Sequence, residues 1–217
     1  MRKRSLIAAS LFVIAVLGAP TASASVIGVG VGVFGAGSTL TTFTGLADGT
    51  EVNGLTVDGI LFQYSLGNGA IVIDGGPGVT NNITPPNIVS IGNNTGVLTL
   101  TLPSLVDTFG YGFAVLSTVA LPVGTTISLF DGVTPVGSLS YGAAPDPTFA
   151  GGFAGIQSTL LFNRVQLTFN STDAPAFAVD NIRTATSVVP EPASLLLLGA
   201  GLTALGVRAR RRTCSRH

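Results

Sequence analysis

The sequence of 217 residues lacks most of the side chains that perform catalysis. Tryptophan is absent, and cysteine, methionine and histidine each occur once. The single cysteine and histidine are Cys214 and His217, and the only lysine is Lys3, so all three lie at the ends of the chain. The central region therefore cannot form a Ser–His or Cys–His nucleophile pair, a zinc site built on His or Cys, or a disulfide. No catalytic residue is predicted.

Charge is also scarce, because charged residues make up only 9% of the chain. The basic residues gather at the two ends, and Arg164 and Arg183 are the only ones between residues 25 and 187. Nine of the ten acidic residues lie in that same interval, which leaves it with about seven net negative charges. Such a surface repels phosphate backbones, so nucleic acid is excluded as a partner. Low charge with abundant glycine also argues against a helical bundle or a coiled coil.

The N-terminus has the layout of a secretory signal peptide. Residues 1–5 carry three positive charges, and residues 6–18 form an apolar run. The small residues Ala22 and Ala24 then fit the pockets of signal peptidase, which predicts a signal peptide over 1–24 and a mature chain that begins at Ser25. The alternative is an uncleaved anchor, although the apolar run is short for a membrane span.

The C-terminus has the features of a second targeting segment. Val189 precedes Pro190, Glu191 and Pro192, and residues 193–207 carry no charge. As a helix these fifteen residues would be about 22 Å long, which is short of a bilayer core of about 30 Å. The arginines that follow would stop transfer and stay in the cytoplasm; they are Arg208, Arg210, Arg211 and Arg212. The central region must then lie across the membrane from this tail.

These three parts in order resemble the sorting signal of PEP-CTERM proteins, also named the ice-binding protein C-terminal domain. The resemblance covers residues 188–217, with the motif at 189–192, the apolar helix at 193–207 and an Arg-rich tail at 208–217. It implies an exopolysaccharide-producing Gram-negative bacterium and processing by the membrane transpeptidase exosortase. By the same resemblance, Pro190, Glu191 and Pro192 form the recognition motif. An ordinary C-terminal membrane anchor is the alternative.

The central region, 25–187, shows the alternation of apolar and polar residues that is typical of β-strands. Leu98, Leu100 and Leu102 share one face of a predicted strand, for example. The ranges with this pattern are 60–65, 70–74, 98–102, 109–115, 126–130, 136–140, 161–169 and 177–182. Turn signals such as Asp58-Gly59 and Asp131-Gly132 separate them. Many short strands with frequent turns predict one all-β domain, an antiparallel β-sandwich or jelly roll.

Two segments resemble the jelly-roll domains of the same family. Residues 43–52 are similar to an opening segment, and residues 177–182 to a closing strand. In carbohydrate-binding-module-like jelly rolls, an Asp at the position of Asp180 often holds a structural calcium ion together with an acid on the first strand. Here Thr44 stands where that acid is frequent. Calcium at Asp180 is therefore a candidate, and the alternative is a bond to the backbone or a turn. No other cofactor is predicted.

The pattern Gly-x-Gly-x-x-Gly at 30–35 spells a dinucleotide fingerprint. Such a site needs a helix N-terminus to receive the pyrophosphate, and Ala36, Gly37 and Ser38 continue as a loop. A glycine-rich first strand is the better interpretation. Residues 99–101 contain a lone Thr-x-Thr, whereas ice binding needs a repeated array.

The sequence thus predicts an exported protein of the cell surface or extracellular matrix with a non-catalytic β-sandwich. Its expected partners are signal peptidase, exosortase, the inner membrane transiently through the C-terminal helix, and exopolysaccharide as a candidate ligand. Tyr64, Tyr111 and Tyr141 are the candidate residues for stacking on sugars. A structural or adhesive protein that self-associates is one alternative. A hydrolase that uses only carboxylates is the other, since paired acids suffice for glycoside hydrolysis.

Export predicts that the mature protein begins at Ser25. Mass spectrometry of the protein recovered from native cells should identify Ser25 as the first residue, because the peptidase cleaves after Ala24. An exported protein that retains Met1 would contradict the signal-peptide prediction.

Overall fold

The computed structural model describes residues 24–187 except 81, 91, 93 and 147–148. The described residues form eleven strands and one short 3₁₀ turn, η1, and all the strand pairs are antiparallel. The elements are β1 (Val26–Gly28), η1 (Val31–Val33), β2 (Thr39–Thr41), β3 (Thr56–Val57), β4 (Ile60–Tyr64), β5 (Ile71–Asp74), β6 (Asn87–Ser90), β7 (Leu98–Val115), β8 (Leu121–Asp131), β9 (Thr134–Asp146), β10 (Phe149–Phe169) and β11 (Phe177–Ala185). The predicted all-β, antiparallel fold class is confirmed.

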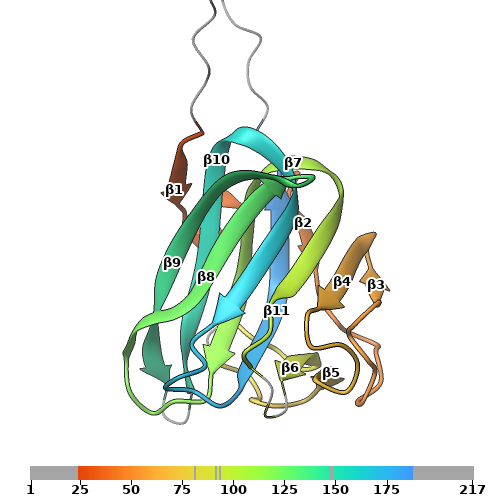
Figure 1. Ribbon diagram of the computed structural model, residues 1–217, viewed down its shortest axis with the longest axis vertical. Helices are drawn as coiled ribbons and strands as arrows, with labels where there is room; N and C mark the ends of the chain where they lie inside the picture. The colour runs from red at the N-terminus through yellow and green to blue at the C-terminus, as the bar shows by residue number, and fades with distance from the viewer. Residues whose placement is uncertain (1–23, 81, 91, 93, 147–148, 188–217) are drawn as a thin grey trace, which may run out of the picture.

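Two long strands, β7 and β10, organise the sheet into a sandwich (Figure 1). Each runs along one layer, bends, and returns along the other, and the two strands pair with each other on both sides of the bends. The first layer contains β3, β4, β8 and most of β9, and the second contains β5, β6 and β11. Strands β1 and β2 pair with β10 and β11 in the second layer.

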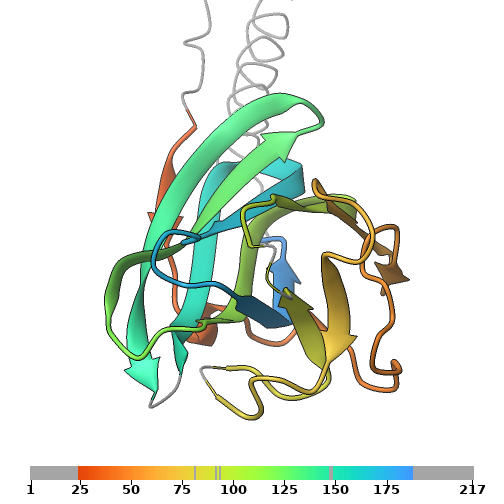
Figure 2. The ribbon, with the colours of Figure 1, turned by 60° about the horizontal axis from the view of Figure 1, so that its bottom comes forward.

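The bends of β7 and β10 lie at one end of the sandwich, which we call the proximal end. The exposed segments Pro103–Leu105 and Thr159–Leu161 form these bends. The β8–β9 hairpin turn is at the same end, since the backbone N–H of Gly132 donates to Asn163 Oδ1 over 2.9 Å. The opposite, distal end carries the segments that join β7 to β8 and β10 to β11 (Figures 1 and 2).

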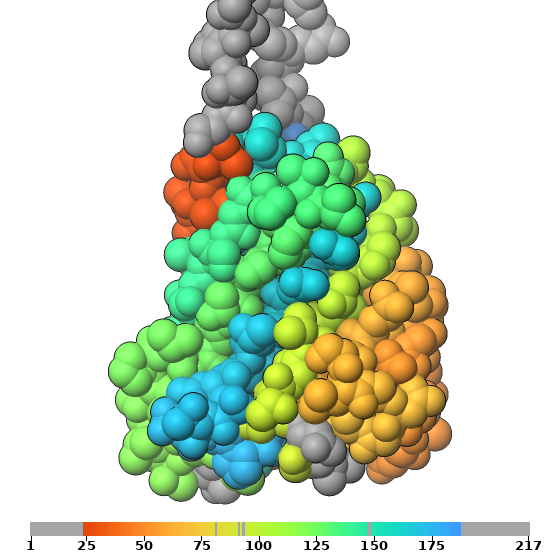
Figure 3. All heavy atoms as spheres, viewed as in Figure 1, coloured from red at the N-terminus to blue at the C-terminus, as the bar shows by residue number. Residues whose placement is uncertain are grey.

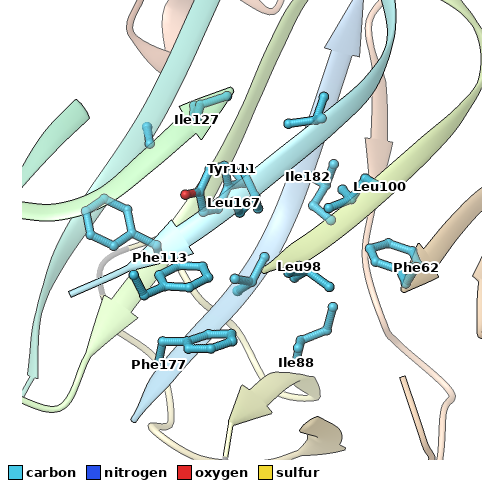
Figure 4. Packing of buried hydrophobic residues seen from close by; sticks show 14 of the residues in the cluster. Phe62, Ile88, Leu98, Leu100, Tyr111, Phe113, Ile127, Leu167, Phe177 and Ile182 are labelled. Carbon is cyan, nitrogen blue, oxygen red and sulfur yellow. The ribbon is translucent and has the colours of Figure 1, made fainter. Parts of the chain in front are cut away.

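The core fills the space between the two layers. Apolar side chains from both layers meet there, among them Phe62, Leu98, Leu100 and Leu167 from the first and Tyr111, Phe113, Phe177 and Ile182 from the second (Figure 4). Phe177 joins the layers directly, since its ring stacks on Phe169 with the centroids 3.8 Å apart and meets Tyr64 edge-on. Packing of this kind stabilises a domain that has no disulfide.

The β3–β4 hairpin forms at the predicted Asp58-Gly59 turn. Both residues have positive φ angles, 49° and 81°, which is the conformation that a two-residue type I′ hairpin requires. Gly59 also lies against Pro103, because a Cβ added there would come within 3.1 Å of the proline ring.

The strand predictions need three corrections. Residues 98–102 and 109–115 belong to one bent strand, β7, rather than to two. Strand β10 begins at Phe149, twelve residues before the predicted start at 161, because its first half is glycine-rich and lacks a clear alternation. The segment 30–35 is not a strand, since Val31–Val33 form the 3₁₀ turn η1.

No helix in the described part of the chain has the length and apolar composition to span a membrane. The signal peptide as far as residue 23, the sorting motif, the apolar segment 193–207 and the arginine tail all lie outside the described residues, so these predictions stand on the sequence.

Candidate functional site

The outer face of the second layer is covered by residues 75–80 and 82–86, which we call the covering segment, and a buried acid lies beneath it. Phe177 and Val179 on β11 point into the main core, whereas Ala178 points outward and packs with Ile83 and Ala114. Side chains alternate along a strand, so Asp180 shares the outer face with Ala178. The covering segment comes close here, since a Cβ added to Gly112 would lie 2.2 Å from the Asn82 carbonyl oxygen.

The carboxylate of Asp180 is only 1% exposed, and just one of its oxygens has a hydrogen-bond donor. The backbone N–H of Thr84 donates to Oδ2 over 2.8 Å. No donor reaches Oδ1. Burial raises the pKa of Asp180 from 3.8 to about 6, and the backbone amides of Thr84 and Asn181 oppose that rise in part.

Asn87 on β6 carries a second buried oxygen without a donor. Its side chain is fully buried, and its Nδ2 donates to the Gly76 carbonyl oxygen over 2.7 Å. Its Oδ1 has no hydrogen-bond partner. The β6–β11 register pairs Ala178 with Val89, and continuing it by two residues places Asn87 opposite Asp180 on the same face.

These two buried acceptor oxygens, on residues that the register places opposite each other, each require a donor or a cation, since an unpartnered buried polar atom is costly. A proton on Asp180 Oδ1 would satisfy both oxygens, by donating to Asn87. A bound water would serve equally.

A calcium ion fits this site only in part. Calcium takes about six to eight oxygen ligands, usually including several carboxylates. The two orphaned oxygens could ligate, but among the described residues no three Asp, Glu, His or Cys side chains gather as a metal cluster. Thr44, at the position where the resemblance implies an acid, is exposed, and its hydroxyl accepts a hydrogen bond from that of Thr42 over 3.2 Å.

An apolar cavity of about 110 Å³ lies on the same outer face, near the distal end. Its walls include Pro77, Val89, Leu116 and Phe149, and they expose no polar surface. Sites for small-molecule ligands usually enclose about 300–1,000 Å³ and contain a few polar groups. This cavity therefore has neither the size nor the polarity for an enclosed sugar.

The three tyrosines do not form a surface for stacking on sugars. Tyr64 and Tyr111 are buried, and Tyr141 is half-buried with its hydroxyl donating to the Gly155 carbonyl oxygen. Desolvation raises the pKa of all three phenols, that of Tyr141 to about 12. These rings belong to the core and its border.

Most of the acidic side chains accept hydrogen bonds from groups close by. Asp74 Oδ1, for example, accepts from the backbone N–H of Gly76, and both oxygens of Glu51 accept from that of Gly69. The acids with such partners are Glu51, Asp74, Asp107, Asp146, Asp173 and Asp180. Their main use in the described region is to hold loops and turns.

The two ends of the described region are each fixed to the sandwich. At the predicted cleavage point, the backbone N of Ser25 donates to Thr159 Oγ1 over 3.0 Å. At the other end, the backbone N–H of Ser187 donates to Asp107 Oδ2 over 2.8 Å. The predicted site residues Ala22, Pro190, Glu191, Pro192 and the four membrane-stop arginines lie outside the described residues.

Residues 188–212 match the family model described as the PEP-CTERM protein-sorting motif. The match confirms the resemblance inferred from the Pro-Glu-Pro motif, the apolar segment and the arginines. The motif indicates export and a surface or extracellular location. No curated protein matches the chain.

Solved structures similar to this one include two mutant forms of CBM29-2, a family 29 carbohydrate-binding module. One is 11% identical, covers 72% of this chain and 99% of that chain, and has a TM-score of 0.40. The other is 10% identical, covers 68% and 90%, and has a TM-score of 0.38. The catalytic domain of a GH87 α-1,3-glucanase in complex with nigerose is 12% identical, covers 71% and 29%, and has a TM-score of 0.38. All three scores lie below 0.5, so no function is transferred from these proteins.

The raised pKa of Asp180 predicts a loss of stability as the pH increases. The folded pKa of about 6 exceeds the unfolded pKa of 3.8. The carboxyl group therefore contributes fully to the free energy of unfolding below pH 3.8, and this contribution is lost as the pH rises through 6. The loss corresponds to about 3 kcal/mol. Asp180→Asn cannot ionise and its amide can donate to Asn87, so it should remove this loss and stabilise the protein at pH 7.5.

Urea unfolding at pH 4.5 to 8, with chelator present, measures the effect. Asp131→Asn, at an exposed hairpin position, is the matched control. Its free energy of unfolding should fall with increasing pH as steeply as that of the wild type. An Asp180→Asn variant that also keeps this slope would show that Asp180 is ionised in the folded protein throughout the range.

Proposed function

We propose that this protein is exported, processed by exosortase, and retained at the cell surface or in the extracellular matrix, where its β-sandwich acts by association rather than by catalysis. The match of residues 188–212 to the sorting motif carries this proposal. The predicted signal peptide at 1–24 supports it, because the sandwich must cross the membrane before the C-terminal segment is processed.

Two features support a non-catalytic role. The described region holds no histidine, cysteine or lysine, which leaves carboxylates as the only strong acid–base groups. Most of these carboxylates already accept hydrogen bonds from loops and turns. Hydrolysis of a glycan by the purified protein, abolished by replacement of one acid, would contradict this role and favour a carboxylate-only hydrolase.

Exopolysaccharide is the proposed contact, with self-association as the structural alternative. Tyr64 and Tyr111 are buried and Tyr141 is half-buried with its hydroxyl bonded to the backbone, so we propose that sugar contact uses hydrogen bonds or a bridging cation rather than aromatic stacking. The short edge strand β3 pairs with β4 alone in the described sheet, and such an edge is where self-association would begin. Retention of the protein on the purified native polymer would favour exopolysaccharide binding. Concentration-dependent sedimentation without such retention would favour self-association.

The sorting role predicts a specific defect when the motif is removed. Replacing Pro190, Glu191 and Pro192 with alanine should leave export intact, because the signal peptide is unchanged. The protein should then accumulate at the inner membrane with its arginine tail attached. Cell fractionation and mass spectrometry measure the outcome, with Thr213→Ala in the tail as control. Wild-type surface levels of the triple variant would contradict exosortase recognition.

We further propose that the unpartnered oxygens of Asp180 and Asn87 bind a calcium ion. An ion bound only by the folded state would stabilise it by about 2.7 kcal/mol at a hundredfold excess over its dissociation constant. Chelator should then lower the melting temperature of the wild type but not that of Asp180→Asn. A melting temperature unaffected by chelator would leave Asp180 as a protonated or water-bound group, and the proposal would be wrong.

A further inference from the structure

Both ends of the described chain leave the sandwich from the proximal end. Ile27 on β1, Gln157 on β10, Thr108 on β7 and Ala185 on β11 follow one another across four neighbouring strands. Strands lie about 4.8 Å apart, so Ile27 and Ala185 are about 14 Å from each other. Figure 3 shows the first described residues beside the bend of β10.

The exit point of the C-terminal segment is held firmly. Asp107, which is only 7% exposed, accepts the backbone N–H of Ser187 through Oδ2 and the hydroxyl of Thr108 through Oδ1. The side-chain amide of Gln157 donates to Ser187 Oγ over 3.0 Å. These bonds, which we call the Asp107 clasp, fix the last described residue against the proximal end.

The connection to the apolar segment is short. Only residues 188–192 separate Ser187 from the start of that segment at 193. Fully extended, this connection spans about 20 Å, and part of it must cross a headgroup layer that is about 5–8 Å deep. A sandwich attached through an inserted segment therefore cannot stand far from the bilayer.

The proximal end presents apolar side chains on its outermost segments. Leu105, Leu160 and Leu161 lie on the two bends and are 45%, 38% and 44% exposed, and Val133 at the β8–β9 turn is 82% exposed. Exposed leucines on adjoining bends form a surface of the kind that contacts a partner or a membrane.

Charge is distributed unevenly along the sandwich. Arg164 and Arg183, the only basic residues of the described region, both lie in its proximal half, which also carries Asp58, Asp107 and Asp131. The distal end carries acids such as Asp146, the last residue of β9, and Asp173, and no basic residue of the described region lies there. An anionic bilayer surface therefore repels the distal end more than the proximal end.

We propose that the proximal end is a membrane-facing surface, on which Leu105, Val133, Leu160 and Leu161 contact the headgroup region while the precursor is anchored. This rests on the proposed membrane insertion of residues 193–207. The Asp107 clasp then holds the sandwich upright and directs the distal loops away from the bilayer. The occupant is a lipid surface, because the short connection brings the bilayer to this end.

Site-directed spin labelling of the full-length chain tests the proposal. In a Cys214→Ser background, one cysteine replaces Leu160, and in a matched variant one replaces Val119, an exposed distal residue. Each chain is reconstituted into vesicles of phosphatidylethanolamine and phosphatidylglycerol. Collisions with a water-soluble nickel chelate are measured and normalised to the same label in the urea-unfolded chain.

The label at position 160 should show a several-fold lower nickel accessibility than the label at 119. A Leu161→Glu substitution added to the first variant should raise that accessibility toward the distal value, whereas Val123→Glu added to the second should not change it. Equal accessibility at 160 and 119 in a chain that resists carbonate extraction would overturn the membrane-facing surface alone. Release of the chain by carbonate would contradict membrane insertion, and with it the proposed anchoring.

Discussion

The pairing of β7 with β10 through both layers is the constraint on which the rest of the structure depends. Even-numbered residues of β7, such as Leu98 and Leu100, face the core before the bend, whereas the odd-numbered Phe109 and Phe113 face it afterwards. Because side chains alternate along a strand, this change requires an odd number of residues to be absorbed at the bend. Strand β10 has register shifts at the matching place, between Gln157 and Arg164. The two bends compensate each other, so one pair of strands can form both faces of a core that has no disulfide.

The same change of phase explains what the sequence could and could not predict. Alternation identified parts of seven strands and the Asp58-Gly59 hairpin, since these depend on local pattern alone. It split β7 into two strands, because an interruption of the period looks like a loop. It missed the first half of β10, where glycines are required by close backbone approach: a Cβ on Gly151 would lie 2.1 Å from the Phe113 carbonyl oxygen. Such a contact between distant segments leaves no periodic signal in the sequence.

The candidate site shows a similar division. Asp180 could be singled out from the sequence, because its segment resembles a closing strand. Asn87 could not, because its importance follows from the β6–β11 register and from the covering segment. The predicted partner position, Thr44, lies exposed instead. The sequence could name the tyrosines only as candidates for stacking on sugars, because an aromatic residue on an alternating strand can face either way and the layer that buries it is not visible in its own segment.

The bends also decide how the sandwich relates to its targeting segments. In the second layer, β1 pairs with β10 and β11 pairs with β7. Strand β1 runs away from the bends, whereas β11 runs toward them. The first strand must therefore begin, and the last strand must end, at the proximal end. The predicted signal peptide and sorting signal are thus joined to the same face of one rigid body, and the loops at the distal end are free of both. An exported protein with this topology can be held at a membrane through either segment without turning over, so the same loops face outward before and after removal of the signal peptide.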